Sequence, residues 1–279
     1  MPAATITRRA SLESRLPDHA RASRSQVLET LPRPLLLILP LFVVVAAAEG
    51  LYLQARRGQR YDWRAFFASL GDAMGRRLIF SAIGVGAITA ILALAWSCRI
   101  TTIPMDRWWS WVLLFLGEEF CYYWMHRADH RIRWMWATHA VHHSSEDVDW
   151  ISAARFHPVN LLLGTIGVDV VLLLAGISPG VMLWLGPLNI FHSAFVHANL
   201  NWTLGPFRYV LATPVFHRWH HTSREEGGDT NFAGTFPLWD ILFGTFRMPE
   251  DTLPDRYGVD DQSSFPREII GQLAYPFRK

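Results

Sequence analysis

The sequence predicts an all-α protein: a multi-span helical integral membrane protein with a cytoplasmic helical cap that is rich in histidine. Two observations support this prediction. Apolar residues make up 51% of the 279-residue chain and are gathered into five long blocks that carry few charges. In addition, every one of the 12 histidines except His19 lies between His126 and His221, in regularly spaced clusters.

The five apolar blocks predict membrane-spanning helices, because several approach the roughly 20 residues that an α-helix needs to cross a bilayer. A soluble protein with buried core helices is the alternative, and five blocks with so few charges argue against it. The fourth and fifth blocks are joined by "GISPG" and predict a helical hairpin over residues 159–198. The blocks run from Leu35 to Leu53, Leu78 to Trp96, Trp108 to Trp124, Leu161 to Ala175 and Val181 to Val196.

Changes in composition divide the chain into four expected parts. Residues 1–34 are arginine-rich and are expected to form a basic, disordered arm, not a secretory signal, because the first apolar block begins too late. Residues 35–107 are expected to be membrane-anchor helices, 108–250 a catalytic domain that contains the clustered histidines, and 251–279 a C-terminal tail. The net charge of +2 is too small to indicate a nucleic-acid partner.

The distribution of arginine predicts which side of the membrane the histidines face. The connection between the first two blocks, from Arg56 to Arg77, is rich in arginine and is therefore expected in the cytoplasm. The third block then delivers His126 to the cytoplasmic side. This topology leaves the N-terminal arm outside, unless the prolines at 32, 34 and 40 make the first block tilt or return to the same side. The sequence leaves both topologies open.

The histidine spacings predict metal binding. Three short stretches, "HRADH", "HAVHH" and "HRWHH", place histidines three or four residues apart, so on a helix each cluster shares one face. One zinc site takes about four ligands, so eight clustered imidazoles predict two metal ions side by side, and imidazole suits Fe, Zn, Cu and Ni. Haem ligation would need only one or two histidines for each haem. The eight are His126, His130, His139, His142, His143, His217, His220 and His221.

These clusters and their flanking residues resemble the fatty acid hydroxylase/sterol desaturase superfamily of membrane di-iron oxygenases. The resemblance rests on "YYWMHRADH", "WMWATHAVHHSSEDVDW", "HANLNW", "TPVFHRWHHTS" and "DTNFAGTFPLWDILFGTF", and it covers roughly Trp108 to Arg247. It implies that the eight histidines, with His197 as a further ligand, bind two iron ions, and that O2 is the co-substrate. The implied reaction is hydroxylation of an unactivated C–H bond in a membrane lipid, with lipid or sterol desaturation as the alternative within the family.

Four further residues are candidates with open roles. His192 precedes His197 by five residues and is either another ligand or a partner inside the helix bundle. His157 precedes a proline, which favours a capping or interface role as much as metal binding. Glu118 and Glu119 lie inside an apolar block, where charge is costly and usually functional. They are expected to orient a ligand histidine or to pair with an arginine.

The chain lacks a flavin, nicotinamide or fused haem-domain motif, so its electrons must come from outside. We expect a reductase with a cytochrome b5-, ferredoxin- or rubredoxin-type carrier, and no catalytic side chain beyond the metal centre. Two other functions stay open. A zinc-dependent membrane hydrolase would leave half of the histidines unused, and a non-catalytic metal transporter or sensor would spread its ligands through the spans. The sequence determines neither the lipid nor the oligomeric state.

Overall fold

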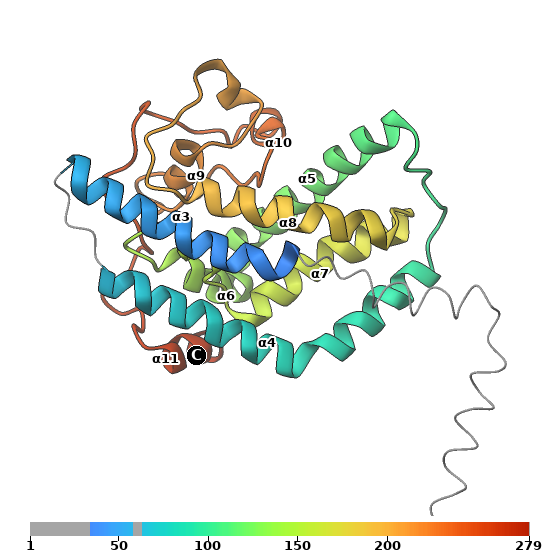
Figure 1. Ribbon diagram of the computed structural model, residues 1–279, viewed down its shortest axis with the longest axis horizontal. Coiled ribbons are helices and arrows are strands. Elements are labelled where there is room, and N and C mark those ends of the chain that lie inside the picture. The colour runs from blue at the N-terminus through green and yellow to red at the C-terminus, as the bar shows by residue number, and fades with distance from the viewer. Residues whose placement is uncertain (1–33, 58–62, 279) are drawn as a thin grey trace, which may run out of the picture. The chain divides into compact units, whose positions relative to one another are not determined.

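The computed structural model describes residues 34–57 and 63–278, and in these ranges the chain folds into α- and 3-10 helices without strands (Figure 1). The all-α prediction is therefore confirmed for the described residues. The predicted basic arm, with His19, lies outside them, apart from Pro34 at the start of the first helix. The long helices are α3 (Pro34–Arg57), α4 (Trp63–Ser97), α5 (Trp108–Arg131), α6 (Arg133–His143), α7 (Pro158–Ala175) and α8 (Pro179–Val196).

Short helices make up most of the regular structure in the C-terminal third. They are connected by irregular segments. In chain order, with η1 placed between α6 and α7, they are η1 (Ser152–Ala154), η2 (Gly205–Tyr209), α9 (Pro214–His220), α10 (Leu238–Leu242), α11 (Ile269–Ala274) and η3 (Tyr275–Phe277).

Helix α7 is the packing centre of the long helices, since both α4 and α5 pack against it. A buried apolar cluster of Leu114, Val168, Leu172 and Ile177 joins α5 to α7 and to the turn that follows α7. Gly176 ends α7 with a φ of 104°, a conformation that side chains with a Cβ rarely adopt. A Cβ at Gly176 would also lie 2.3 Å from the Thr101 carbonyl oxygen. The segment expected as a hairpin therefore contains two helices joined by a tight glycine turn.

One helix among the described residues, α7, is long and apolar enough to cross a membrane by length and composition. Two shorter apolar helical segments, Val43–Ala55 and Gly86–Ser97, lie within α3 and α4. Helix α5 exposes large apolar side chains from its first residue to Trp124. These are Trp108, Trp109, Trp111, Val112, Leu113, Leu116, Phe120 and Trp124.

Candidate metal centre

Four helices bring the clustered histidines together. Helix α5 continues past its apolar turns and carries His126 and His130 on its last turns, and α6 packs against it with the "HAVHH" triplet. Helix α9 carries "HRWH" and begins where the Thr213 hydroxyl accepts a hydrogen bond from the Phe216 N–H, with Pro214 at its first position. His197 caps the C-terminal end of α8, which packs against α9.

The nine histidines form two groups of converging nitrogens. In each group, one ring nitrogen of every member lies within 4.8 Å of the others. Each H-x-x-H-H triplet is divided between the groups, and the groups touch, because the His143 ring stacks on the His221 ring at 4.4 Å between centroids. The five-histidine group contains His126, His130, His139, His143 and His220, and the four-histidine group contains His142, His197, His217 and His221.

The outward nitrogens of four histidines donate hydrogen bonds to oxygen atoms. Nδ1 of His126 donates to the Phe232 carbonyl at 2.8 Å, and Nδ1 of His220 donates to the Thr230 carbonyl at 2.7 Å. In the same way, His139 Nδ1 bonds the Asn160 side-chain oxygen at 3.1 Å, and His197 Nδ1 bonds the Ser193 carbonyl at 2.6 Å. A carbonyl oxygen can only accept, so in these neutral rings the proton is on Nδ1 and Nε2 presents a lone pair.

These lone pairs face one another at short distances. His126 Nε2 lies 3.1 Å from His139 Nε2. His197 Nε2 lies 3.2 Å from His142 Nε2, 3.2 Å from His217 Nε2 and 3.1 Å from His221 Nε2. Converging lone pairs repel unless a cation lies between them. Two nitrogens bound at right angles to an ion about 2.1 Å away are about 3 Å apart, so both groups fit a metal ion.

Burial keeps these imidazoles in the form that binds metal. All nine rings are almost fully buried, with exposed fractions of 5% or less. Burial lowers the pKa of the three histidines of "HAVHH" and the three of "HRWHH" well below the usual value. The neighbouring imidazoles lower these pKa values further. Neutral imidazole is the metal-ligating state.

A loop between α9 and α10 supplies two of the outer partners. Asn231 has a φ of 59°, in the left-handed conformation that asparagine tolerates. It lies in sequence between Thr230, whose carbonyl accepts from His220, and Phe232, whose carbonyl accepts from His126. The fully buried Asp240 accepts from the Phe232 and Ala233 N–H groups at 2.8 and 2.7 Å, and from the Thr245 hydroxyl at 2.7 Å. Asp240 therefore fixes the backbone that orients the His126 ring.

Arg218 braces the four-histidine group in a similar way. Its side chain is 2% exposed. It donates to the His197 carbonyl at 2.9 Å, to the Val148 carbonyl and to the Tyr257 hydroxyl. The guanidinium also lies 4.4 Å from the centre of the Tyr257 ring. This arginine ties the end of α8 to α9 and to the segment that follows α6.

The structure places the four open candidates outside both groups of nitrogens. His157 caps α7, because its Nδ1 accepts from the Val159 N–H while its Nε2 donates to the Leu273 carbonyl. The His192 ring is half-buried and packs near Phe195. Glu118 accepts a hydrogen bond from the Asn189 amide.

Glu119 binds the same loop as Asp240. The Glu119 carboxylate accepts a hydrogen bond from the Thr235 N–H at 2.8 Å. Thr235 lies three residues after Phe232, whose carbonyl accepts the hydrogen bond from His126. No hydrogen bond among the described residues joins either glutamate to a ring of the nine histidines. Glu119 is therefore linked to the histidine groups by hydrogen bonds through the loop that contains Phe232 and Thr235.

Two outer partners were not predicted from the sequence. Asn160, on the first turn of α7, accepts from His139, and Asp229 Oδ1 lies 3.6 Å from His130 Nδ1. Asn160 lies three residues after His157 and Asp229 opens the "DTNF" stretch, so both lie beside motifs that the sequence shows. Nothing in those motifs specifies the contacts, which depend on how α7 and the loop fold back.

The buried histidines predict a strong loss of stability at acidic pH. In the unfolded chain a histidine has a pKa of about 6.5, whereas burial lowers the folded values well below this. Below about pH 6.5 the unfolded chain therefore binds protons that the folded chain does not, and each such histidine costs up to about 1.4 kcal/mol of stability per pH unit. Above that pH the difference vanishes.

The measurement is the thermal unfolding midpoint of metal-free protein, followed by near-ultraviolet circular dichroism between about pH 7.5 and 5.5. We expect the midpoint to be constant at the upper end and to fall steeply below about pH 6.5. A midpoint that stays level down to pH 5.5 would contradict the assignment of neutral, buried rings.

The fold and the site together define a helical protein with a paired, all-histidine metal-binding centre. Residues 111–245 match the family model described as fatty acid hydroxylase, a range that contains all nine histidines. This match confirms the resemblance to the family seen in the sequence motifs.

Similar proteins with curated names are lipid-modifying enzymes. The chain is 32% identical to an alkylglycerol monooxygenase of Xenopus tropicalis over 209 residues, which cover 75% of this chain and 46% of that protein. It is 35% identical to the human alkylglycerol monooxygenase over 55% of this chain and 34% of that protein. It is also 32% identical to an ornithine lipid hydroxylase of Rhizobium tropici, over 62% of this chain and 53% of that protein.

The chain spans about half the length of these relatives, or less. No solved structure matches it.

Proposed function

We propose that this protein is a membrane-bound di-iron oxygenase that hydroxylates an unactivated C–H bond of a lipid, with O2 and external electrons. The observation that carries the proposal is the division of nine buried histidines into adjacent groups of five and four nitrogens. This arrangement provides for two ions side by side and uses every member of the three clusters. A single-zinc hydrolase would leave one group without a role.

The chain's own residues build and shield the centre. The carbonyls of Thr230, Phe232 and Ser193 hold three rings with Nε2 turned inward, a constraint that fixes ligand orientation and raises metal affinity. Near-complete burial of the rings excludes bulk water from the place where the C–H bond would be attacked. When bound, two iron ions would supply the redox chemistry that activates O2, which these side chains lack.

We further propose that the long helices lie in a bilayer, with the histidine groups at its cytoplasmic face. Helix α7 meets the length and hydropathy that a span requires. The exposed aromatic and aliphatic side chains at the start of α5, from Trp108 to Trp124, form an apolar surface that water would disfavour. Tryptophans at helix ends are typical of membrane interfaces. A lipid substrate could then approach the centre from within the bilayer.

The test of the proposed reaction is comparative lipid mass spectrometry. Cells that express the protein are compared with cells that express the His220→Ala variant at equal levels. We expect a lipid class that gains about 16 mass units, one oxygen atom, only with the unaltered protein, and incorporation of label from 18O2 into that product. A loss of two mass units would instead show desaturation.

The names of the relatives indicate which lipids to search first. One relative is named for alkylglycerol and another for ornithine lipid, so alkylglycerols and ornithine-containing lipids are the first classes to compare. A lipid profile that is unchanged between the two strains, with the unaltered protein folded and metal-loaded, would contradict the proposed function.

A further inference from the structure

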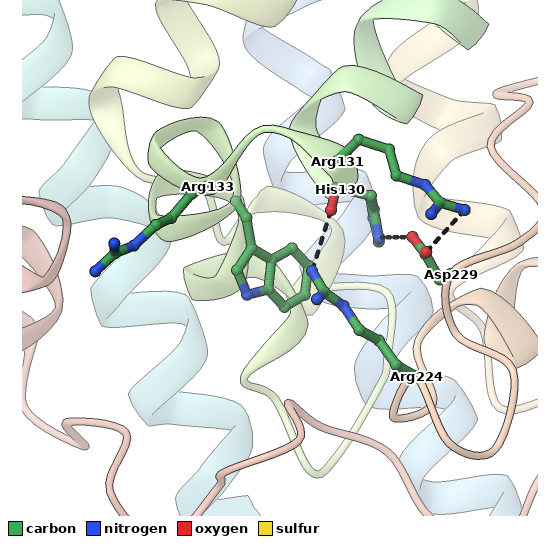
Figure 2. A pocket seen from close by; sticks show the side chains of 6 residues that line it. His130, Arg131, Arg133, Arg224 and Asp229 are labelled. Atoms are coloured by element: carbon green, nitrogen blue, oxygen red, sulfur yellow. Dashed lines mark hydrogen bonds and ion pairs between the residues drawn. The ribbon is translucent and has the colours of Figure 1, made fainter.

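A small pocket opens beside the five-histidine group, and one of the nine histidines lines it. Its volume is about 270 Å³, below the roughly 300–1,000 Å³ of typical small-molecule sites. It is large enough for a single side chain of a partner protein. Figure 2 shows the residues that line it, which are His130, Arg131, Arg133, Trp136, Arg224 and Asp229.

The rim of this pocket is positively charged. Arg131 pairs with Asp229 at 3.0 Å, and Arg224 lies 3.8 Å from Asp260, so two of the three cations already have an acidic neighbour. Arg133 is exposed and has no acidic partner among the residues that the structure describes. Guanidinium groups bind carboxylates in preference to apolar groups. The charge therefore favours an acidic partner and disfavours the hydrocarbon chain of a lipid.

The inner wall of the pocket is the half-buried ring of Trp136, which contacts the metal-binding histidines. Its centroid lies 5.0 Å from that of His130, 5.4 Å from His143 and 6.4 Å from His139, all in the five-histidine group. On the side of the pocket, the Arg224 guanidinium lies 4.9 Å from the Trp136 ring.

A second short connection runs from the surface to the same group. The Arg224 guanidinium donates to the His130 carbonyl at 3.1 Å. Asp229 joins the exposed Arg131 to the His130 ring, as the dashed lines in Figure 2 show. A partner seated at the rim would thus be separated from the metal ligands by one layer of side chains.

We propose that this pocket is the docking point of an acidic, one-electron carrier protein, with Trp136 as the contact through which electrons enter. The inference rests on the proposed function. Hydroxylation consumes one O2, two electrons and two protons, since one oxygen atom enters the C–H bond and the other leaves as water. A one-electron carrier therefore docks twice in each turnover. At each docking the carrier would lose one electron, which two bound iron ions would accept through Trp136.

The first test measures docking without turnover. The probe is an acidic [2Fe–2S] ferredoxin in its oxidised form, and binding to the full-length protein in detergent is measured by surface plasmon resonance at low and high salt. Arg133→Glu is expected to weaken binding about tenfold at low salt and to reduce its salt dependence. Arg256→Glu, the same charge change at an exposed residue outside the pocket, is the matched control and is expected to bind as the unaltered protein does.

The second test measures electron entry by stopped-flow mixing of metal-loaded protein with the reduced ferredoxin. At saturating carrier concentration, Trp136→Leu is expected to oxidise the bound carrier at least tenfold more slowly than the unaltered protein. Trp136→Phe, which keeps an aromatic ring, is expected to recover part of the rate. Metal content is measured for each variant, so that a loss of iron is not mistaken for slow transfer.

Two outcomes would overturn the docking proposal: equal binding by Arg133→Glu and Arg256→Glu, or ferredoxin oxidation by an iron-loaded Trp136→Leu variant at the unaltered rate. A separate experiment tests the proposed function itself. Fully pre-reduced protein, freed of reductant, is mixed with O2 and lipid, and the product of a single turnover is measured. If the single turnover gives product but the variants bind and oxidise the carrier as the unaltered protein does, only the docking site is rejected. If the single turnover gives no product, the proposed hydroxylase function is rejected.

Discussion

Replacing His220 with alanine is expected to lower activity by more than about 100-fold, the upper end of the loss seen when only an outer partner of a ligand is removed. The ring is fully buried, and it turns Nε2 into the five-histidine group because Nδ1 donates to the Thr230 carbonyl at 2.7 Å. The variant should also retain at most one metal ion per chain, as measured by plasma mass spectrometry of purified protein.

His142→Ala is the companion variant, because His142 belongs to the four-histidine group. It should abolish activity as well, while the five-histidine group keeps its ligands. His19→Ala should change neither metal content nor activity, and it serves as the histidine control. Full iron content and turnover in the His220 variant would contradict the two-group assignment.

Replacing Asp240 with alanine is the second change for which we expect a large effect. The substitution leaves two backbone N–H groups without their acceptor in a fully buried place, whereas the Thr245 hydroxyl keeps its hydrogen bond with the Tyr123 hydroxyl at 2.9 Å. Unsatisfied donors of this kind cost about 1–3 kcal/mol each. The carbonyl that orients His126 belongs to Phe232, one of these residues, so metal affinity should fall about 10- to 100-fold, as for other outer partners of metal ligands.

The measurements are a chelator titration of bound iron and the thermal midpoint of the metal-free protein. Asp240→Asn keeps one side-chain oxygen as an acceptor and should recover part of both losses. Asp251→Ala removes an exposed acid that pairs with Arg208 and should leave both quantities unchanged. If Asp240→Ala bound iron and unfolded as the unaltered protein does, the loop would not be held in the way described.

The sequence predicted eight of the nine histidines because their spacing is local, whereas His197 was implied only by the family resemblance. Spacings of three and four residues fix which imidazoles share a helix face before any tertiary contact forms. It did not predict that each triplet is divided between two groups. Adjacent positions on a helix point about 100° apart, so His142 and His143 face different groups once α6 packs against α5.

The outer partners were harder to predict, for a physical reason. The acceptors for His126, His197 and His220 are backbone carbonyls, which every residue has, and their direction depends on the fold of the chain. Asp240 was visible in the sequence, but its role depends on a loop that begins with the left-handed turn at Asn231. The sequence shows the glutamates of α5 only as charges inside an apolar block, whereas in the structure Glu118 bonds Asn189 and Glu119 bonds the loop at Thr235.

The most direct test of the central claim is the metal content of the purified full-length protein after expression with iron. Two groups of nitrogens, each able to hold an ion, predict two iron ions per chain. A single zinc ion per chain, with no iron bound under conditions that preserve the fold, would contradict the account.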